Sequence, residues 1–191
     1  MTRQTIMKSA GRGGTILILG GARAGKSAFA LKLAAEVQAG GQTPVCFIAT
    51  AQALDDEMRQ RIARHRSERP SHWTTIEEPI NLDAAVDQAP QAAVIIIDCL
   101  TLLVSNWLLR EDGSTAEDLF VTIDNALALA ADSNKHLIFV SNEVGLGLVP
   151  DTQLGRRFRD TLGRINQRLA QAVDTVYFLV AGLPVRIKPP S

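Results

Sequence analysis

Eight residues, 20–27, follow the pattern G-x-x-x-x-G-K-[ST] of a phosphate-binding loop; we call them the phosphate loop. Glycine lets such a loop curl until its N–H groups point at phosphate oxygens, and the following helix adds the positive end of its dipole. Lys26 is expected to reach the β- and γ-phosphates, and Ser27 to bind Mg²⁺. This predicts a nucleoside triphosphate site rather than a glycine turn beside a solvated lysine.

A carboxylate, Asp98, ends the apolar run at residues 92–98. Mg²⁺ coordination beside a phosphate loop requires a carboxylate at the end of a buried strand. The alternative is that Asp98 caps the helix that follows, a role for which Thr101 competes. We expect Asp98 and Ser27 to be the metal ligands.

Arginines dominate residues 55–69, which include a helix predicted at residues 55–68 with an acidic first turn. Met58, Ile62 and His65 recur at i, i+4 and i+7, which places His65 on an inward, apolar stripe. Neighbouring arginines disfavour the protonated imidazole, and a neutral imidazole is a competent nucleophile toward phosphorus. The residues alone leave a solvated charged face and a functional histidine equally open.

Other polar residues give weaker signals. Glu77 and Glu78 end a strand-like segment at residues 73–79, where either could bind a ribose hydroxyl or a water on a metal, or be ordinary surface charge. His72 and His136 lack the setting of a catalytic histidine, so surface or packing roles are expected for them.

Alternating strands and helices must position these groups. Apolar runs predict strands at residues 15–19, 44–49, 92–98, 137–140, 175–180 and 185–188. Helical spacing predicts helices at residues 26–39, 55–68, 100–109, 116–131 and 154–172. The pattern predicts an α/β, P-loop NTPase-like fold, with a mostly parallel central sheet, helices on both faces and a closing antiparallel strand near the C-terminus. Ligands bind at the carboxyl ends of the strands in such sheets.

Composition excludes several classes. The 191 residues suit one domain, expected at 15–191 after a disordered lead-in at 1–14. Twenty basic residues balance twenty acidic ones, which argues against a nucleic-acid partner. No apolar run reaches the roughly 18 residues of a membrane span, and the start lacks a secretory signal. Cys46 and Cys99 lie in apolar runs and are expected to be buried free thiols in a reducing compartment, so we expect a cytoplasmic protein.

Taken together, the motifs resemble the bifunctional adenosylcobinamide kinase/adenosylcobinamide-phosphate guanylyltransferases of cobalamin assembly. The resemblance covers roughly residues 15–188. The motifs that carry it lie at residues 20–27, 48–51, 55–58, 61–65, 69–70, 73–77, 141–147, 157–160 and 166–168.

The resemblance implies two reactions at one nucleotide site. A nucleoside triphosphate, ATP or GTP, phosphorylates the aminopropanol hydroxyl of adenosylcobinamide. GTP then gives GMP to a histidine, which falls on His65, with loss of pyrophosphate, and GMP passes to adenosylcobinamide phosphate to form adenosylcobinamide-GDP. Mg²⁺ is the implied cofactor, and a homo-oligomer, a trimer in similar proteins, is the implied assembly.

The resemblance also implies the site residues. The catalytic residues are Lys26 and His65, and the metal ligands are Ser27 and Asp98. The nucleotide contacts fall on Gly20, Gly21, Ala22, Arg23, Ala24, Gly25, Lys26, Ser27, Ala49, Thr50, Ala51, Arg66, Ser67, Glu68, Arg69, Glu77 and Asp98. Ala24 replaces a serine common in the family, and some members carry glutamate in place of Asp98. The resemblance does not give the corrinoid contacts; because residues 141–150 follow the carboxyl end of a predicted strand, we expect them to form part of the corrinoid surface.

Three other functions compete with this assignment. A small GTPase switch needs an Asn-Lys-x-Asp element, and the only Asn-Lys pair, at Asn134, lacks the acid. A nucleic-acid-dependent ATPase is disfavoured by zero net charge. A small-molecule kinase that never uses His65 would phosphorylate its acceptor without forming a covalent nucleotide.

Overall fold

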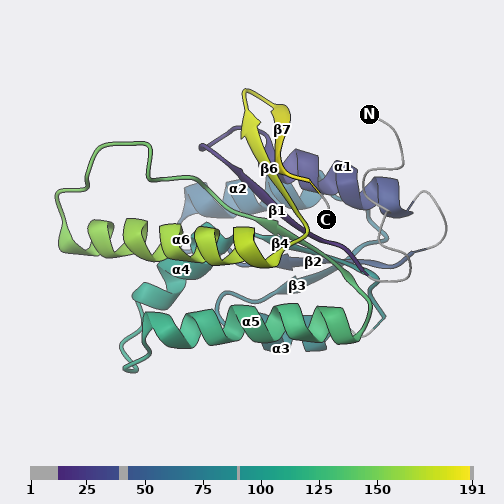
Figure 1. Cartoon of the computed structure of the whole chain (residues 1–191), viewed down its shortest axis with the longest axis horizontal. Helices are drawn as coiled ribbons and strands as arrows, with labels where there is room; N and C mark the ends of the chain where they lie inside the picture. Colours follow the sequence, from purple (N-terminus) through teal and green to yellow (C-terminus); the bar gives the residue numbers. More distant parts are fainter. Residues whose placement is uncertain (1–12, 39–42, 90, 190–191) are drawn as a thin grey trace.

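The computed structural model describes residues 13–38, 43–89 and 91–189. The strands are β1 (Thr15–Gly20), β2 (Val45–Ala49), β3 (Thr74–Glu77), β4 (Val94–Asp98), β5 (His136–Val140), β6 (Thr175–Val180) and β7 (Leu183–Lys188). The helices are α1 (Lys26–Gln38), α2 (Asp56–Ser67), α3 (Leu82–Asp87), α4 (Leu100–Leu108), α5 (Ala116–Asp132) and α6 (Gln153–Ala172). Figure 1 shows strands and helices alternating along the chain, as the sequence predicts.

The strands form one sheet in the order β3-β2-β4-β5-β1-β6-β7. All neighbouring pairs are parallel except β6 and β7, which are antiparallel. This confirms the predicted mostly parallel sheet with a closing antiparallel strand. Because β1 lies between β5 and β6, the phosphate loop emerges between the segment that follows β5 and the turn that follows β6.

Apolar side chains of the strands pack into a hydrophobic core on each face of the sheet. Along β1, Leu17 packs toward α3, α4, α5 and α6, and Ile18 packs toward α1 on the opposite face. Neither side chain is exposed to solvent. Burial on both faces explains why the strands read as continuous apolar runs.

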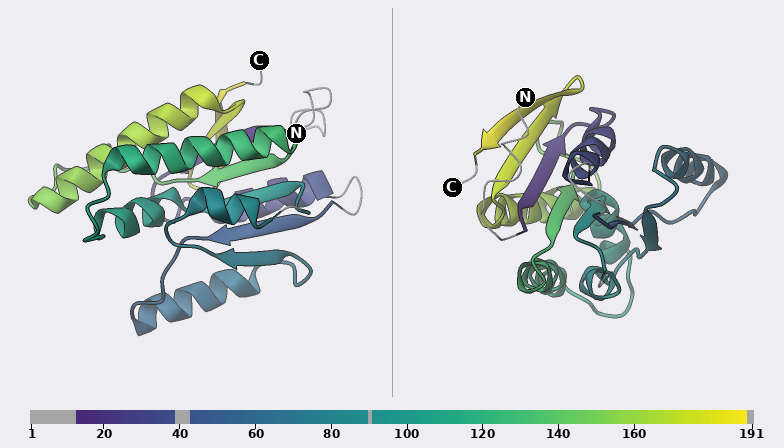
Figure 2. Two further views of the ribbon diagram at one scale, coloured as in Figure 1. Left: turned by 90° about the horizontal axis from the view of Figure 1, so that it is seen from below. Right: turned by 90° about the vertical axis from the view of Figure 1, so that its right-hand side faces the viewer.

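Helix α2 departs from the expected inward packing. Met58, Ile62 and His65 do share one face and are partly buried, but no residue of α2 is fully buried. Figure 2 shows α2 standing away from the rest of the molecule, beside the β3 edge of the sheet. Helical spacing identified the face that turns toward the sheet, but its side chains are only partly buried.

Smaller differences concern element boundaries and burial. Helix α3 was not expected. Strand β7 begins at Leu183 rather than at residue 185, because the chain reverses at Ala181 and Gly182, the two residues between β6 and β7. Cys46 is buried as expected, but Cys99 is partly exposed; both thiols are free.

Residues 1–12 of the expected lead-in lie outside the described residues. Gly14 is held against β5: its N–H donates to Nδ1 of His136 at 3.0 Å, and its carbonyl accepts from the N–H of Leu137 at 3.1 Å. Among the helices within the described ranges, none is long and apolar enough to cross a membrane.

Candidate active site

The phosphate loop connects β1 to the first turn of α1. Gly25 has a φ of +88°, and a Cβ on Gly20 would lie 2.6 Å from a backbone oxygen of β6, so glycine is required at both positions. Lys26 is only 7% exposed, and its Nζ donates to the carbonyl oxygen of Gly21 at 2.6 Å. The ammonium group therefore reaches back across the loop to its second glycine.

Asp98, at the carboxyl end of β4, meets the phosphate loop. Burial raises the pKa of its carboxyl group above the usual range, while a hydrogen bond from the Ser27 hydroxyl opposes the shift. Three basic side chains oppose it further, namely His65, Arg69 and Lys26. Conversely, burial lowers the pKa of Lys26, and the carboxylate of Asp98 is among the groups that oppose this change. A hydroxyl and a carboxylate thus lie side by side next to a buried cation.

Helix α2 brings His65 to the same edge of the sheet. Asp55 caps the helix by accepting from the N–H of Met58 at 2.7 Å, and the first turn is acidic, which favours a helix start at this point. The face that carries Ile62 and His65 is turned toward the sheet. His65 lies close enough to Asp98 to influence its pKa, and Arg61 does the same for Lys26. The helix therefore presents its inner face to the phosphate loop.

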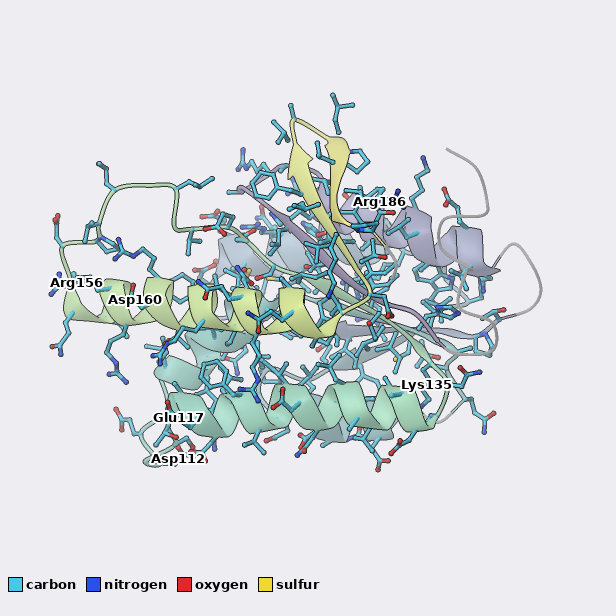
Figure 3. All side chains as sticks on the ribbon, viewed as in Figure 1. Asp112, Glu117, Lys135, Arg156, Asp160 and Arg186 are labelled. Atoms are coloured by element: carbon cyan, nitrogen blue, oxygen red, sulfur yellow. The ribbon has the colours of Figure 1, made fainter. Side chains whose placement is uncertain are left out.

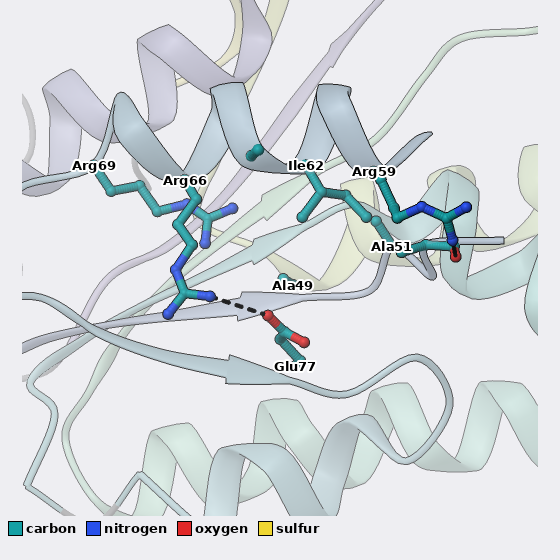
Figure 4. A pocket seen from close by; sticks show the side chains of 9 residues that line it. Ala49, Ala51, Arg59, Ile62, Arg66, Arg69 and Glu77 are labelled. Carbon is teal, nitrogen blue, oxygen red and sulfur yellow. Dashed lines mark hydrogen bonds and ion pairs between the residues drawn. The ribbon is translucent and has the colours of Figure 1, made fainter. Parts of the chain in front are cut away.

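A cavity of about 280 Å³ lies between α2 and the β2–β3 edge of the sheet; we call it the α2 cavity (Figure 4). Its lining residues are Ala49, Ala51, Ala53, Arg59, Ile62, Ala63, Arg66, Arg69 and Glu77. On the sheet side, Ala49 of β2 and Glu77 of β3 line the cavity, and α2 contributes Arg59, Ile62, Ala63 and Arg66. Arg66 Nη1 and Glu77 Oε1 lie 3.8 Å apart, and both side chains are largely exposed. The volume lies just below the range of about 300–1,000 Å³ typical of ligand pockets.

Arg69 is the arginine of this cavity that the fold holds most tightly. Its guanidinium lies 3.5 Å from the ring centroid of Phe47, and Nη1 donates to Oγ1 of Thr75 at 3.4 Å. Nε is buried and has no hydrogen-bond partner among the described residues. Burial lowers the pKa of Arg69, and Asp98 is the strongest opposing charge. A stacked, oriented cation can bind an anion without first being ordered.

Thr50 does not present its hydroxyl to the α2 cavity. The side chain is fully buried, and its Oγ1 donates to the carbonyl of Cys99 at 2.7 Å and accepts from the N–H of Cys99 at 2.8 Å. Asn106 Nδ2 donates to the carbonyls of Thr50 at 2.8 Å and Pro79 at 3.0 Å. Sequence reasoning missed Asn106, whose only signal is an amide in a mostly apolar helix. These bonds fix the backbone beside Asp98.

The segment after β5 is fastened to both α6 and the phosphate loop. Ser141 donates to Oδ1 of Asn166 at 2.7 Å, and Nδ2 of Asn166 donates to the carbonyl of Asn142 at 3.0 Å. The N–H of Asn142 donates to Oγ1 of Thr101 at 2.9 Å. The N–H of Glu143 donates to the carbonyl of the first glycine of the phosphate loop at 3.1 Å. This explains why polar residues follow an apolar strand at this point.

The structure gathers most of the residues predicted for the site. Ser27 and Lys26 of the phosphate loop lie beside Asp98, as does His65. The predicted nucleotide contacts that line the α2 cavity are Ala49, Ala51, Arg66, Arg69 and Glu77. Ser67 and Glu68 are exposed and do not line the cavity, and the Ser67 hydroxyl donates to the carbonyl of Arg64 at 2.8 Å.

Comparison with known sequences gives one consistent result. Residues 16–187 match the family model described as cobinamide kinase / cobinamide phosphate guanyltransferase. The chain is 44% identical over 173 residues to the bifunctional adenosylcobalamin biosynthesis protein CobP of Pseudomonas aeruginosa, covering 90% of this chain and 96% of that protein. It is 39% identical over 185 residues to the bifunctional adenosylcobalamin biosynthesis protein CobU of Escherichia coli, covering 91% and 99%.

Solved structures share the fold at low sequence identity. The flagellar accessory protein FlaH of Methanocaldococcus jannaschii superposes with a TM-score of 0.57 at 16% identity, covering 97% of this chain and 83% of FlaH. The ATPase domain of G40P superposes with a TM-score of 0.54 at 16% identity, covering 87% and 69%. These similarities confirm the P-loop NTPase-like fold.

Proposed function

Because the chain belongs to the cobinamide kinase / cobinamide phosphate guanyltransferase family, we propose that its nucleotide site performs two successive transfers, and that a covalent GMP on His65 links the second donor to its acceptor. The first transfer moves the γ-phosphoryl group of a nucleoside triphosphate to the hydroxyl of adenosylcobinamide. The second moves GMP from GTP to the resulting phosphate.

In the kinase step, the acceptor oxygen attacks the γ-phosphorus, and the bond to the β–γ bridging oxygen breaks. The hydroxyl proton passes to solvent, and the nucleoside diphosphate departs. The phosphate loop orients the triphosphate through backbone N–H groups, and Lys26 offsets the negative charge that builds on the bridging oxygen. Positioning and electrostatics supply most of the rate in such transfers.

In the guanylyl step, an imidazole nitrogen of His65 attacks the α-phosphorus of GTP. A nitrogen–phosphorus bond forms, the bond to the α–β bridging oxygen breaks, and pyrophosphate leaves. A phosphate oxygen of the acceptor then attacks the same phosphorus, which breaks the nitrogen–phosphorus bond and frees His65. Two displacements avoid bringing two polyanions together in a single step.

The arginines of the α2 cavity suit this second step. Arg66 and Arg69 follow His65 in the chain and line the cavity, and a phosphoryl group in transfer carries negative charge that such donors stabilise. Glu77 lies across from Arg66 at 3.8 Å, where it can accept a hydrogen bond from a ribose hydroxyl. We assign the nucleoside of GTP to this cavity.

Mg²⁺ is the metal proposed for both transfers. The hydroxyl of Ser27 and the carboxylate of Asp98 offer two adjacent oxygen ligands, as suits an ion that takes one or two protein oxygens and completes its shell with phosphates and water. Within the described ranges, no group of three His, Cys, Asp or Glu side chains could hold a metal alone. Once bound, the ion would neutralise phosphate charge.

One observation carries the proposal: the Ser27 hydroxyl donates to Asp98, and the side chains of His65 and Lys26 lie close enough to lower the pKa of that carboxyl group. A nucleophile and a phosphate cradle therefore face one nucleotide. We also propose that the protein forms a trimer, as the family resemblance implies, and light scattering of the purified protein tests this.

GTP labelled at either phosphate separates the two transfers. With γ-labelled GTP, Mg²⁺ and adenosylcobinamide, we expect label on the corrinoid and none stable on the protein. With α-labelled GTP and no acceptor, we expect acid-labile, base-stable label on the protein. His65→Ala should lose the α-label and retain the γ-transfer, whereas the control His72→Ala should retain both. Label retained in His65→Ala would overturn the assignment.

A further inference from the structure

The arginines of α2 lie on different sides of the helix. The α2 residues that line the α2 cavity are Arg59, Ile62, Ala63 and Arg66. Because an α-helix turns about 100° per residue, these four positions share one side of α2, and Figure 4 shows Ile62 and Arg66 extending from it toward the sheet. His65 lies about 110° round the helix from the middle of that side. Arg61, one turn before His65, lies on the same side as His65. We call this second side of α2 the Arg61–His65 side.

The Arg61–His65 side meets the phosphate loop. Burial raises the pKa of the Asp98 carboxyl group, and the positive charge of His65 is among the groups that oppose this rise. Burial lowers the pKa of Lys26, and the positive charge of Arg61 lowers it further. Such effects need short distances, because salt screens exposed charges beyond about 10 Å. His65 therefore lies beside a predicted metal ligand, and Arg61 lies beside the ammonium group that is expected to reach the β- and γ-phosphates.

Arg61 has no acidic partner, unlike Arg59, whose Nη2 lies 2.7 Å from Oδ1 of Asp56. No ion pair among residues 13–38, 43–89 and 91–189 includes Arg61, which is exposed. Arg186, a cation labelled in Figure 3, lies on β7, at the opposite edge of the sheet from α2. Arg61 and Lys26 repel each other as like charges, and an anion bound between them would offset this repulsion.

The spacing of Arg61 and His65 suits the length of a triphosphate. Four residues advance about 6 Å along a helix axis, and two bridging oxygens separate the α- and γ-phosphorus atoms of a nucleoside triphosphate by a span of the same order. Residues that follow His65 in the chain, Arg66 and Arg69, line the cavity assigned to the nucleoside, whereas Arg61 precedes it. With the α-phosphate at His65, the γ-phosphate therefore lies near Arg61.

We propose that Arg61 binds the γ-phosphate of GTP from the side of α2, opposite Lys26, and holds the far end of the pyrophosphate that leaves when His65 takes GMP. This rests on the proposed function, because pyrophosphate leaves only if a nucleophile attacks the α-phosphorus. The planar guanidinium donates to two phosphate oxygens at once. In the second displacement, the acceptor phosphate attacks along the line that pyrophosphate left, so it takes the place of the β-phosphate. The γ-phosphate position stays empty, and this step does not need Arg61.

The first test separates the two displacements at His65. The adduct is formed with α-labelled GTP, freed of nucleotide, and mixed with Mg²⁺ and either pyrophosphate or cobinamide phosphate. With pyrophosphate, an oxygen attacks the phosphorus of the adduct, the nitrogen–phosphorus bond breaks, and labelled GTP forms again. Arg61→Ala should raise the KM for pyrophosphate at least about tenfold, as expected for the loss of a hydrogen bond between charged groups. The KM for cobinamide phosphate should stay within about twofold of wild type, because the acceptor makes no contact at the γ-phosphate position.

The second test measures affinity without a reaction. A GTP analogue with a methylene group in place of the α–β bridging oxygen cannot release pyrophosphate, and GDP lacks the γ-phosphate. In calorimetry, Arg61→Ala should lose about tenfold in affinity for the analogue and less than about twofold for GDP. Arg61→Lys keeps the charge without the planar guanidinium and should lose less. The control Arg64→Ala removes an exposed arginine on the side of α2 opposite Ile62 and should change neither affinity.

Two results would overturn the inference. One is an unchanged KM for pyrophosphate and an unchanged affinity for the analogue in Arg61→Ala. The other is an equal loss with pyrophosphate and cobinamide phosphate, or with the analogue and GDP, which would indicate a displaced helix rather than a lost phosphate contact. Alanine is a strong helix former, so the variant should keep α2 folded. If wild-type protein forms no adduct with GTP, the proposed function fails, and the comparison of the analogue with GDP still decides whether Arg61 binds the γ-phosphate.

Discussion

Replacing Thr50 with valine tests whether this residue positions the site rather than contacting nucleotide. The hydroxyl makes two hydrogen bonds of 2.7 and 2.8 Å with the backbone of Cys99, in a side chain with no solvent exposure. Valine has nearly the same shape but leaves the N–H of Cys99 unpaired, whereas the carbonyl of Cys99 still accepts from the N–H of Leu103 at 3.1 Å. An unpaired buried N–H costs about 1–3 kcal/mol, so we expect a loss of about 1–3 kcal/mol in the free energy of unfolding.

Urea denaturation followed by circular dichroism measures this loss as a lower midpoint at unchanged slope. Thr50→Ser keeps the hydroxyl and should lose no more than about 1 kcal/mol. Thr74→Val, at an exposed position of β3, is the matched control and should stay within about 0.5 kcal/mol of wild type. The affinity of Thr50→Val for Mg²⁺ and GTP should fall as well, because Cys99 follows Asp98. A midpoint equal to that of wild type would refute the reasoning.

Three further predictions concern Asp98, His136 and Arg66. Because burial raises the pKa of Asp98, its negative charge is costly in the nucleotide-free protein. Asp98→Asn should therefore leave the stability of the nucleotide-free protein unchanged or higher, which thermal unfolding without nucleotide measures. The same variant should lower kcat in the kinase assay at least about 100-fold. Burial lowers the pKa of His136 from 6.5, so the folded state binds a proton at this imidazole less tightly than the unfolded state does. The contribution of His136 to the free energy of unfolding should therefore be full above pH 6.5 and should fall as the pH drops through 6.5 toward the folded pKa. His136→Gln should lose this pH dependence in urea titrations. Arg66→Ala breaks only an exposed ion pair, so it should change stability by less than about 0.5 kcal/mol, yet it should raise the KM for GTP in the guanylyl assay.

The phosphate loop and Asp98 were predictable from sequence because their chemistry fixes local patterns. A loop that cradles phosphate needs glycine at Gly20 and Gly25, and the structure shows the positive φ and the close backbone approach that require it. The apolar run before Asp98 marked a buried strand ending in a carboxylate, as found in β4. Parallel strands then bring their carboxyl ends together without further information.

Contacts between distant segments could not be predicted in the same way. Thr50 pairs with Cys99 across 49 residues, and Asn106 reaches the carbonyl of Thr50 across 56. Both contacts depend on the register between β2 and β4, which an apolar run does not specify. Helix α3 was missed because six residues carry too short a periodic signal. The spacing in α2 located the face of His65 but contained no information on whether another element covers it.

The central claim is that His65 carries GMP between the two substrates. Mass spectrometry of proteolysed protein, after incubation with GTP and Mg²⁺, tests it most directly. We predict a GMP adduct on the peptide that contains His65, which disappears when cobinamide phosphate is added and reappears as the corrinoid product. An adduct on another residue, or guanylyl transfer at the wild-type rate by His65→Ala, would contradict the account.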